Sequence, residues 1–282
     1  MKNLIESISD SLNVDLSLSN YLVIGSAFGK KTILLFRENE RTPYLVVKIP
    51  EDEEGGVRCK MEYDGLGKLS LLSLKNVICS HQVGIIKHNE YTCYVQTYEA
   101  SSLLLNKLNL ITNSPNEEVF LYVTEQLVDI YKTSLVGNKQ PGVSYYRCFQ
   151  HGDFWMGNLG VRKNKLVLYD LEFSSNMGLP LYDLIHFGLY YCRVADNVGK
   201  VGIKLFGKKA VKENRKFNLT SVDVACCLLG DSELANVMRK CIKLYVDKCG
   251  ISRQDARKLI VDYIEFDRGI QGLNSGWIEK VM

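Results

Sequence analysis

The hydrophobic pattern of the chain changes near residue 100, and this change constrains the fold more than any other feature of the sequence. Before it, five short β-rich runs alternate with turns: Tyr21–Gly25, Lys31–Arg37, Tyr44–Ile49, Val83–Lys87 and Tyr91–Thr97. Short runs separated by turn residues predict an antiparallel sheet. Between the third and fourth runs, Val57–Lys75 has apolar residues at helical spacing, so we expect one helix inserted in the sheet.

Longer helical patterns follow residue 100. Ser114 as N-cap, Pro115 at the first helical position and Glu117 of a capping box predict a helix over Pro115–Lys132. Its apolar face is expected at Phe120, Val123, Leu127 and Ile130. Further helices are expected over Asp231–Lys248 and Ser252–Asp267, with Gly250 at the end of the first and Ser252 capping the second.

These patterns together predict an α+β fold. We expect a β-rich N-lobe over residues 1–99, made of the antiparallel sheet plus one helix, and a mainly helical C-lobe over residues 100–282. A cleft between two such lobes is the natural place for a ligand.

The bulk composition is that of an ordinary globular protein. Apolar residues make up 46% of the 282 residues, and no stretch approaches the roughly 18 apolar residues of a membrane-spanning helix, so no stable membrane insertion is expected. Nine cysteines without a C-x-x-C pair indicate reduced thiols, and the N-terminus lacks the apolar core of a secretory signal, so we expect a cytoplasmic protein. The net charge of +3 does not indicate nucleic-acid binding, and nothing in the sequence indicates an oligomeric state.

The strongest functional signal lies between residues 150 and 172. The stretch Gln150–Asn158 places Asp153 and Asn158 in a loop, and the apolar run that follows ends in Asp170-Leu171-Glu172. Carboxylate and amide oxygens gathered in this way suit a hard divalent cation such as Mg²⁺, which is usually bound by a few protein oxygens together with substrate phosphates. The combination predicts phosphoryl transfer.

The chemistry of phosphoryl transfer assigns a role to each of these groups, because its loose transition state requires mainly positioning and charge neutralisation. Asp153 is expected to orient the acceptor hydroxyl and take its proton as catalytic base. Asn158 and Asp170 are expected to hold the metal ion against the phosphates. Glu172 is expected to bind a second ion, either directly or through water.

These segments resemble the kinase-like phosphotransferases that include aminoglycoside phosphotransferases, choline and ethanolamine kinases, and related sugar and homoserine kinases. The family loop H-G-D-x-x-x-x-N is matched by His151, Gly152, Asp153 and Asn158, and the strand ending D-x-E by Asp170 and Glu172. The later element G-x-P-x-x-D-L is matched by Gly178–Leu184. The resemblance implies a two-lobed protein-kinase-like fold.

The resemblance also implies a function: transfer of the γ-phosphoryl group of ATP, or of GTP, to a hydroxyl of a small metabolite or antibiotic. Aminoglycoside, choline-like amine, sugar and amino acid alcohol all stay open as acceptors. A protein kinase fits less well, because Gly152 stands where that family has arginine, Asp170-Leu171-Glu172 replaces D-F-G, and no A-P-E follows. The alternative from another class is a catalytically silent nucleotide-binding regulatory module on the same fold.

The N-lobe of this family supplies the expected nucleotide contacts. The stretch Ile24–Lys30, with Gly25, Ser26 and Gly29, lies where the kinase fold places a glycine-containing hairpin over the phosphates, although it also reads as a plain β-turn. Lys48 resembles the lysine that pairs with the α- and β-phosphates, unless it is a solvent-exposed strand lysine. Its expected ion-pair partner is Glu62, although one of several acidic neighbours of Glu62 could take this place instead.

Gln96 and Tyr98 are expected in a hinge whose backbone meets the adenine of the nucleotide. The basic stretch Lys200–Lys216 suits an anionic substrate, a membrane surface or, more simply, a solvated loop. His186 falls in an apolar helix-like run and is assigned no role.

Overall fold

The computed structural model describes residues 2–13, 16, 19–27, 29–88, 90–108, 114–137, 139, 141–201, 219–270, 279 and 281. By internal contacts the chain divides into two compact units. Unit 1 comprises Met1–Ser102 and Val161–Ser174, and unit 2 comprises Leu103–Gly160 and Ser175–Met282. The return of the chain to unit 1 over Val161–Ser174 has no counterpart in the sequence-based division at residue 99.

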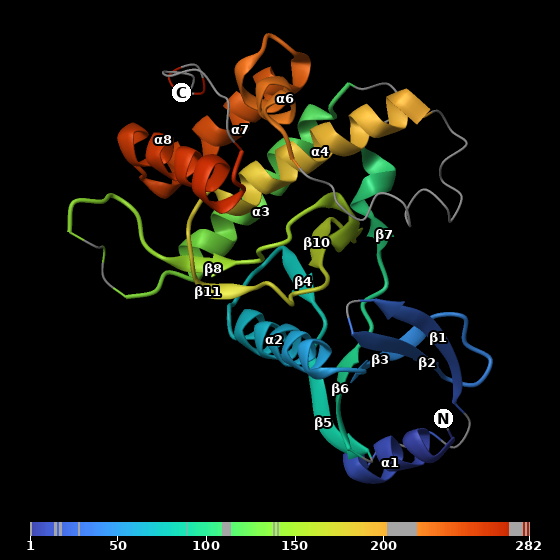
Figure 1. Cartoon of the computed structure of the whole chain (residues 1–282). Helices are drawn as coiled ribbons and strands as arrows, with labels where there is room; N and C mark the ends of the chain where they lie inside the picture. The colour runs from blue at the N-terminus through green and yellow to red at the C-terminus, as the bar shows by residue number, and fades with distance from the viewer. Residues whose placement is uncertain are drawn as a thin grey trace. The chain divides into compact units, whose positions relative to one another are not determined.

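Unit 1 is built on a five-stranded antiparallel sheet with the strand order β1-β2-β3-β6-β5 (Figure 1). Its strands are β1 (Asn20–Ala27), β2 (Lys30–Phe36), β3 (Pro43–Pro50), β5 (Gln82–His88) and β6 (Tyr91–Thr97). All five correspond to the β-rich runs of the sequence, and the antiparallel pairing is confirmed.

Alternate residues of a strand point to opposite faces of a sheet. Each face of this sheet is covered by a helix. On one face, Leu35 and Val47 of the sheet pack with Ile8 of α1 (Lys2–Leu12) in a core cluster. On the other, Tyr94 of β6 clusters with Cys59 and Tyr63 of α2 (Glu53–Ser70). Helix α1 has no counterpart in the sequence-based expectation of one helix.

The predicted bounds of the inserted helix are wrong: α2 begins at Glu53 and ends at Ser70 instead of spanning Val57–Lys75. The physical reason for the early start is Asp52, whose side chain accepts a hydrogen bond of 2.6 Å from the Gly55 backbone N–H and so caps the first turn.

A second, parallel pairing in unit 1 supports the Asp170-Leu171-Glu172 segment. Strand β10 (Lys165–Leu168) lies parallel to β4 (Val77–Cys79), with Leu166 opposite Val77. The chain crosses between the units within the short strands β7 (Ser102–Leu103) and β9 (Leu159–Arg162), and again between Ser174 and Ser175.

Unit 2 is largely helical. Its helices are η1 (Leu104–Lys107), α3 (Glu117–Thr133), η2 (Met156–Asn158), α4 (Tyr182–Val201), α6 (Ser221–Val224), η4 (Ala225–Leu229), α7 (Glu233–Cys249), α8 (Arg253–Val261) and η5 (Asp262–Asp267). A two-stranded antiparallel sheet joins β8 (Cys148–Gln150) to β11 (Ser175–Gly178). Phe120 of α3 anchors the helical core against α4, with ring centroids 5.0 Å from Phe187 and 5.1 Å from Tyr191. The four apolar positions predicted for α3 are all buried.

The capping predictions have mixed outcomes. Ser114 is not the N-cap of α3; Asn116 is, because its side chain accepts from the Val119 N–H at 3.3 Å, while the Ser114 hydroxyl donates to Glu233. Gly250 ends α7 in the left-handed region at φ 65°, and Ser252 caps α8, both as predicted.

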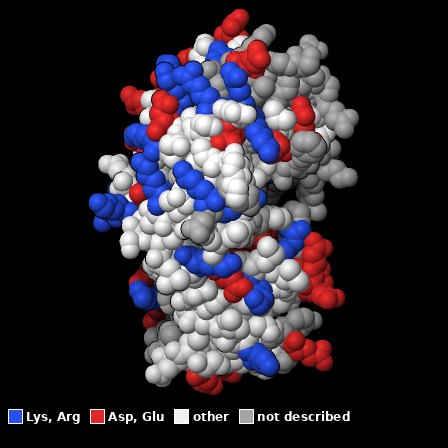
Figure 2. All heavy atoms as spheres, turned by 90° about the vertical axis from the view of Figure 1, so that its left-hand side faces the viewer, with Lys and Arg blue, Asp and Glu red and all other residues white. Residues whose placement is uncertain are grey.

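The elements described confirm the predicted α+β fold class. In the helices that the structure describes, none combines the length and the apolar character needed to cross a bilayer. On the face drawn in Figure 2, basic and acidic side chains are intermixed, as expected for a small net charge.

The packing of α1 on the sheet predicts the cost of a core truncation. Leu35 is fully buried at 0% exposure, whereas Leu71 is 84% exposed, so they form a matched pair for the same substitution. We expect Leu35→Ala to lower the free energy of unfolding by about 2 to 5 kcal/mol, because it leaves a cavity, and Leu71→Ala to change it by less than about 0.5 kcal/mol. Urea unfolding of the full chain measures both values, and equal losses would contradict the described core.

Candidate active site

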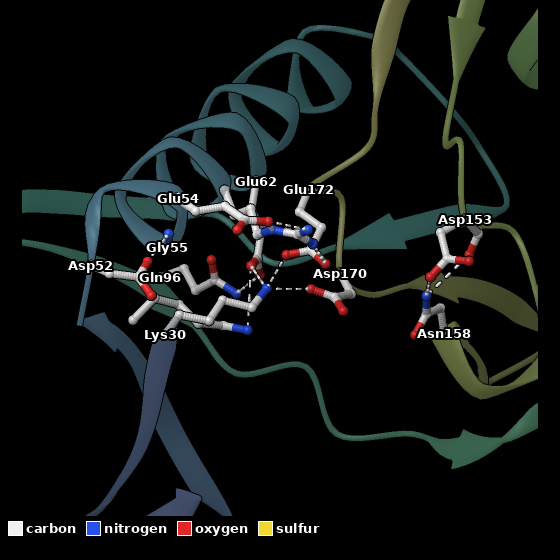
Figure 3. Close-up of polar contacts among 12 residues, drawn as sticks. Lys30, Asp52, Glu54, Gly55, Glu62, Gln96, Asp153, Asn158, Asp170 and Glu172 are labelled. Atoms are coloured by element: carbon white, nitrogen blue, oxygen red, sulfur yellow. Dashed lines mark hydrogen bonds and ion pairs between the residues drawn. The ribbon is translucent and has the colours of Figure 1, made fainter. Parts of the chain in front are cut away.

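A buried lysine organises the charged groups of unit 1. The ammonium of Lys30, at the start of β2, lies 2.5 Å from Glu172 Oε2, 3.1 Å from Asp170 Oδ1 and 3.4 Å from Glu62 Oε2 (Figure 3). Lys30 is only 6% exposed. Burial alone would lower the pKa of Lys30, but the three carboxylates outweigh it and hold this pKa above its ordinary value.

The ion pair expected between Lys48 and Glu62 is present. Lys48 Nζ lies 3.3 Å from Glu62 Oε2, and Gln96 Nε2 donates to the other oxygen of the same carboxylate at 3.3 Å. Glu62 is therefore held by Lys30, Lys48 and Gln96 together. The role of Lys48 at a nucleotide phosphate stays a prediction.

The two carboxylates that follow β10 differ in exposure. Glu172 is 4% exposed in its side chain and lies between Lys30 and Arg58, whose NH1 is 3.3 Å from Glu172 Oε1. The Asp170 side chain is 35% exposed. Its backbone adopts φ 56°, a left-handed conformation that aspartate tolerates better than most residues and that is often found at functional sites. Asp170 is therefore the more accessible of the two carboxylates, and the roles of both at a metal ion stay predictions.

The donor set fits a magnesium ion. Among the residues that the structure describes, no three His, Cys, Asp or Glu side chains surround a common metal position. Mg²⁺ does not require such a cage, because it keeps several waters and binds through one or two carboxylates and the substrate phosphates. The position of Lys30 against Asp170 and Glu172 shows that these oxygens already attract a cation.

The predicted phosphate-binding stretch is anchored to α2. Gly25 lies at a bulge between the registers Ile24↔Thr32 and Ser26↔Lys31, while Phe28 lies outside the described residues. Gly29 has φ 69°, and a Cβ built on it would approach the Asp52 carboxylate to 2.2 Å, so only glycine fits. Its carbonyl accepts from the Glu51 N–H at 2.6 Å. The role of Gly25, Ser26 and Gly29 at a phosphate stays a prediction.

The predicted hinge residues are engaged within unit 1. Gln96 is buried and its side chain binds Glu62, as described above. The Tyr98 N–H donates to the Tyr44 carbonyl at 3.0 Å, and the Glu99 carbonyl accepts from the Tyr169 hydroxyl at 2.7 Å. An adenine contact of Gln96 and Tyr98 stays a prediction.

In unit 2, a buried carboxylate fixes the His-Gly-Asp loop. Asp183 at the start of α4 accepts from the backbone N–H of His151 at 2.7 Å and of Gly152 at 3.0 Å. Gly152 adopts φ 82°, which allows both donors to turn toward one side chain. Burial raises the pKa of Asp183, and these two hydrogen bonds oppose the rise. The loop thus has a defined conformation.

Asp153 and Asn158 contact each other directly. Asn158 Nδ2 donates to Asp153 Oδ2 at 2.9 Å and to the Asp153 carbonyl at 3.0 Å (Figure 3). With Nδ2 so used, the carbonyl oxygen Oδ1 is the atom of Asn158 that can act as a metal ligand. The Asp153 side chain is 30% exposed, so part of it is open to an acceptor.

Seven of the predicted site residues thus fall into two groups. Lys48, Glu62, Gln96, Asp170 and Glu172 come together around Lys30 in unit 1, and Asp153 meets Asn158 in unit 2. That Asn158 and Asp170 hold one ion stays a prediction.

Three residues were not singled out from the sequence: Lys30, Asp183 and His186. Lys30 directly follows the glycine-containing stretch, and Asp183 lies within the Gly178–Leu184 element, so both had a local signal. His186 had none beyond its place among apolar residues.

No protein-family model and no curated protein matches the chain. Solved structures of aminoglycoside phosphotransferases are similar to it. The GDP complex of wild-type aminoglycoside 2'-phosphotransferase-IIIa is 13% identical with a TM-score of 0.48, over 95% of this chain and 98% of that one. Aminoglycoside phosphotransferase APH(3'')-Id from Streptomyces rimosus is 7% identical with a TM-score of 0.48, over 89% and 98%. The GDP and kanamycin complex of APH(2'')-IIia is 12% identical with a TM-score of 0.47, over 95% and 99%.

The two lysines of unit 1 provide a matched test of the ion cluster. Lys30→Met is expected to lower the free energy of unfolding by about 3 to 5 kcal/mol, because it removes the buried cation that Glu62, Asp170 and Glu172 share. Lys48→Met is expected to cost only about 1 kcal/mol, because Glu62 keeps Lys30 and Gln96 as partners. Chemical unfolding at neutral pH compares them, and a larger loss for Lys48→Met would show that Lys30 does not hold the cluster together.

Proposed function

We propose that the chain is a small-molecule phosphotransferase that moves the γ-phosphoryl group of ATP, or of GTP, to a hydroxyl of a small acceptor. The observation that carries this proposal is the pairing of Asp153 with Asn158 in a loop fixed by Asp183. The ion cluster around Lys30, with Asp170 at its accessible edge, supports it from unit 1. Asp153, Asn158 and Asp170 were expected from the sequence for this one chemistry.

In the proposed reaction Asp153 orients the acceptor hydroxyl through its carboxylate and takes the proton as the bond to phosphorus forms. Asn158 keeps the carboxylate in place through Nδ2. Lys48, held by Glu62, binds the α- and β-phosphates, and the backbone around Gly25, Ser26 and Gly29 covers them. Magnesium held by Asn158, Asp170 and Glu172 would supply charge neutralisation at the phosphates.

The acceptor class is not narrowed by the described residues. Aminoglycoside, choline-like amine, sugar and amino acid alcohol stay open, and the basic stretch Lys200–Lys216 that bears on this choice lies mostly in residues 202–218, outside the described part of the chain. A catalytically silent regulatory module is the alternative function. No described contact favours it, and such a module has no need of both Asp153 and Asp170.

The base assignment predicts the outcome of removing Asp153. We expect Asp153→Ala to lower acceptor-dependent nucleotide turnover by several orders of magnitude and to leave nucleotide affinity within about threefold, because Asp153 acts on the acceptor. Release of ADP or GDP is measured against a panel of hydroxylated metabolites and antibiotics. Asp231→Ala, an exposed aspartate in the same unit, is the control and should match wild type.

The same panel separates the two candidate functions. Turnover with one acceptor class identifies the substrate and supports the enzyme. Tight nucleotide binding without turnover on any acceptor, in wild type as in Asp153→Ala, would favour the silent module.

A further inference from the structure

We propose that His186 of α4 is a positioning residue for Asp153, fixed as the neutral Nε2–H tautomer by Arg268 so that this N–H holds the Asp153 carboxylate. The inference rests on the proposed role of Asp153 as base. It assigns a task to a buried histidine and to an arginine that follows η5.

The geometry forms a continuous chain of contacts within unit 2. His186 Nε2 lies 3.4 Å from Asp153 Oδ1. His186 is only 2% exposed, and among the described residues no group, Asp153 included, meets full hydrogen-bond geometry at this nitrogen. A buried ring N–H is costly without a partner, so the carboxylate is its natural acceptor. Contacts of catalytic groups are often long before substrate binds, and they tighten in the complex.

The partners of the other ring nitrogen decide the tautomer. Arg268 NH2 lies 2.8 Å and the Tyr263 hydroxyl 2.9 Å from His186 Nδ1, and Arg268 Nε donates to that hydroxyl at 2.9 Å. A guanidinium can only donate, so Nδ1 must be an acceptor and carries no proton. The single proton of the neutral ring is therefore on Nε2, the nitrogen that faces Asp153.

The surroundings also keep the ring neutral. Burial lowers the pKa of His186 below its ordinary value, the charge of Arg268 acts in the same direction, and the carboxylates oppose them. The groups that face the ring are Asp153 of the loop, Asp183 and Tyr190 of α4, Tyr263 of η5 and Arg268. Tyr190 stacks on the ring at 4.3 Å between centroids, which fixes its plane.

The consequence is that Asp153 is held from two sides. Asn158 Nδ2 donates to Oδ2, and His186 Nε2–H faces Oδ1. Two neutral donors fix the rotation of the carboxylate without neutralising its charge, so it stays able to accept a proton. A protonated His186 would instead form a salt bridge that weakens Asp153 as a base.

The tautomer is tested directly by ¹⁵N NMR, which is practical because the chain has only 4 histidines. We expect His186 to show the Nε2–H pattern at neutral pH, because burial and Arg268 lower its pKa. Asp153→Asn should shift the Nε2 resonance. Arg268→Met should raise the pKa of His186, because a positive charge is removed. A protonated Nδ1 at neutral pH, or no response to Asp153→Asn, would overturn the proposal.

A kinetic comparison separates positioning from packing. His186→Leu fills a similar volume without the N–H, whereas His186→Gln places an amide N–H near the position of Nε2. We expect His186→Leu to lower kcat for nucleotide turnover by roughly 10- to 100-fold with little change in the KM for nucleotide, and His186→Gln to recover part of it. Equal kcat in the two variants and wild type would refute a positioning role.

The two experiments also distinguish this inference from the proposed function. If the wild-type chain transfers no phosphoryl group, the proposed function fails. The NMR result still decides whether His186 holds Asp153.

Discussion

The constraint on which both units depend is that a charge removed from water must be neutralised or hydrogen-bonded. In unit 1, Lys30 meets this requirement for Glu62 and Glu172, and in doing so it connects β2, α2 and the segment after β10. In unit 2, Asp183 meets it by accepting hydrogen bonds from the backbone N–H groups of His151 and Gly152. The same contacts that make these charges tolerable also place the residues of the candidate site.

The parts of the fold that could be predicted from sequence are those with a local cause. The strands of the antiparallel sheet, the apolar face of α3 and the caps at Gly250 and Ser252 each follow from residues close together in the chain. The loop residues Asp153 and Asn158 were found for the same reason, because they lie five positions apart. The Lys48–Glu62 pair was foreseen only through the resemblance to a known family.

The parts that could not be predicted depend on distant residues. In the sequence, Lys30 has the pattern of a lysine in a turn, and its contacts with Asp170 and Glu172, about 140 positions later, are evident only in the structure. In the same way, His186 has the pattern of a core histidine, and only the structure shows its contacts with Asp153 and Arg268. The N-cap of α3 was misplaced because Ser114 and Asn116 are both good caps, and the contact of Ser114 with Glu233 that separates them is long-range.

The balance of charge in unit 1 bears on how a metal ion would enter. Glu62, Asp170 and Glu172 face Lys30, Lys48 and Arg58 in the cluster, and Arg58 also pairs with the exposed Glu54. A divalent ion alone would add two positive charges close to Lys30, which is unfavourable because Lys30 is buried. A nucleotide brings its own negative phosphates, which would offset the metal and attract the lysines away from the carboxylates. Under the proposed function, the cluster would therefore accept metal and nucleotide together more readily than metal alone.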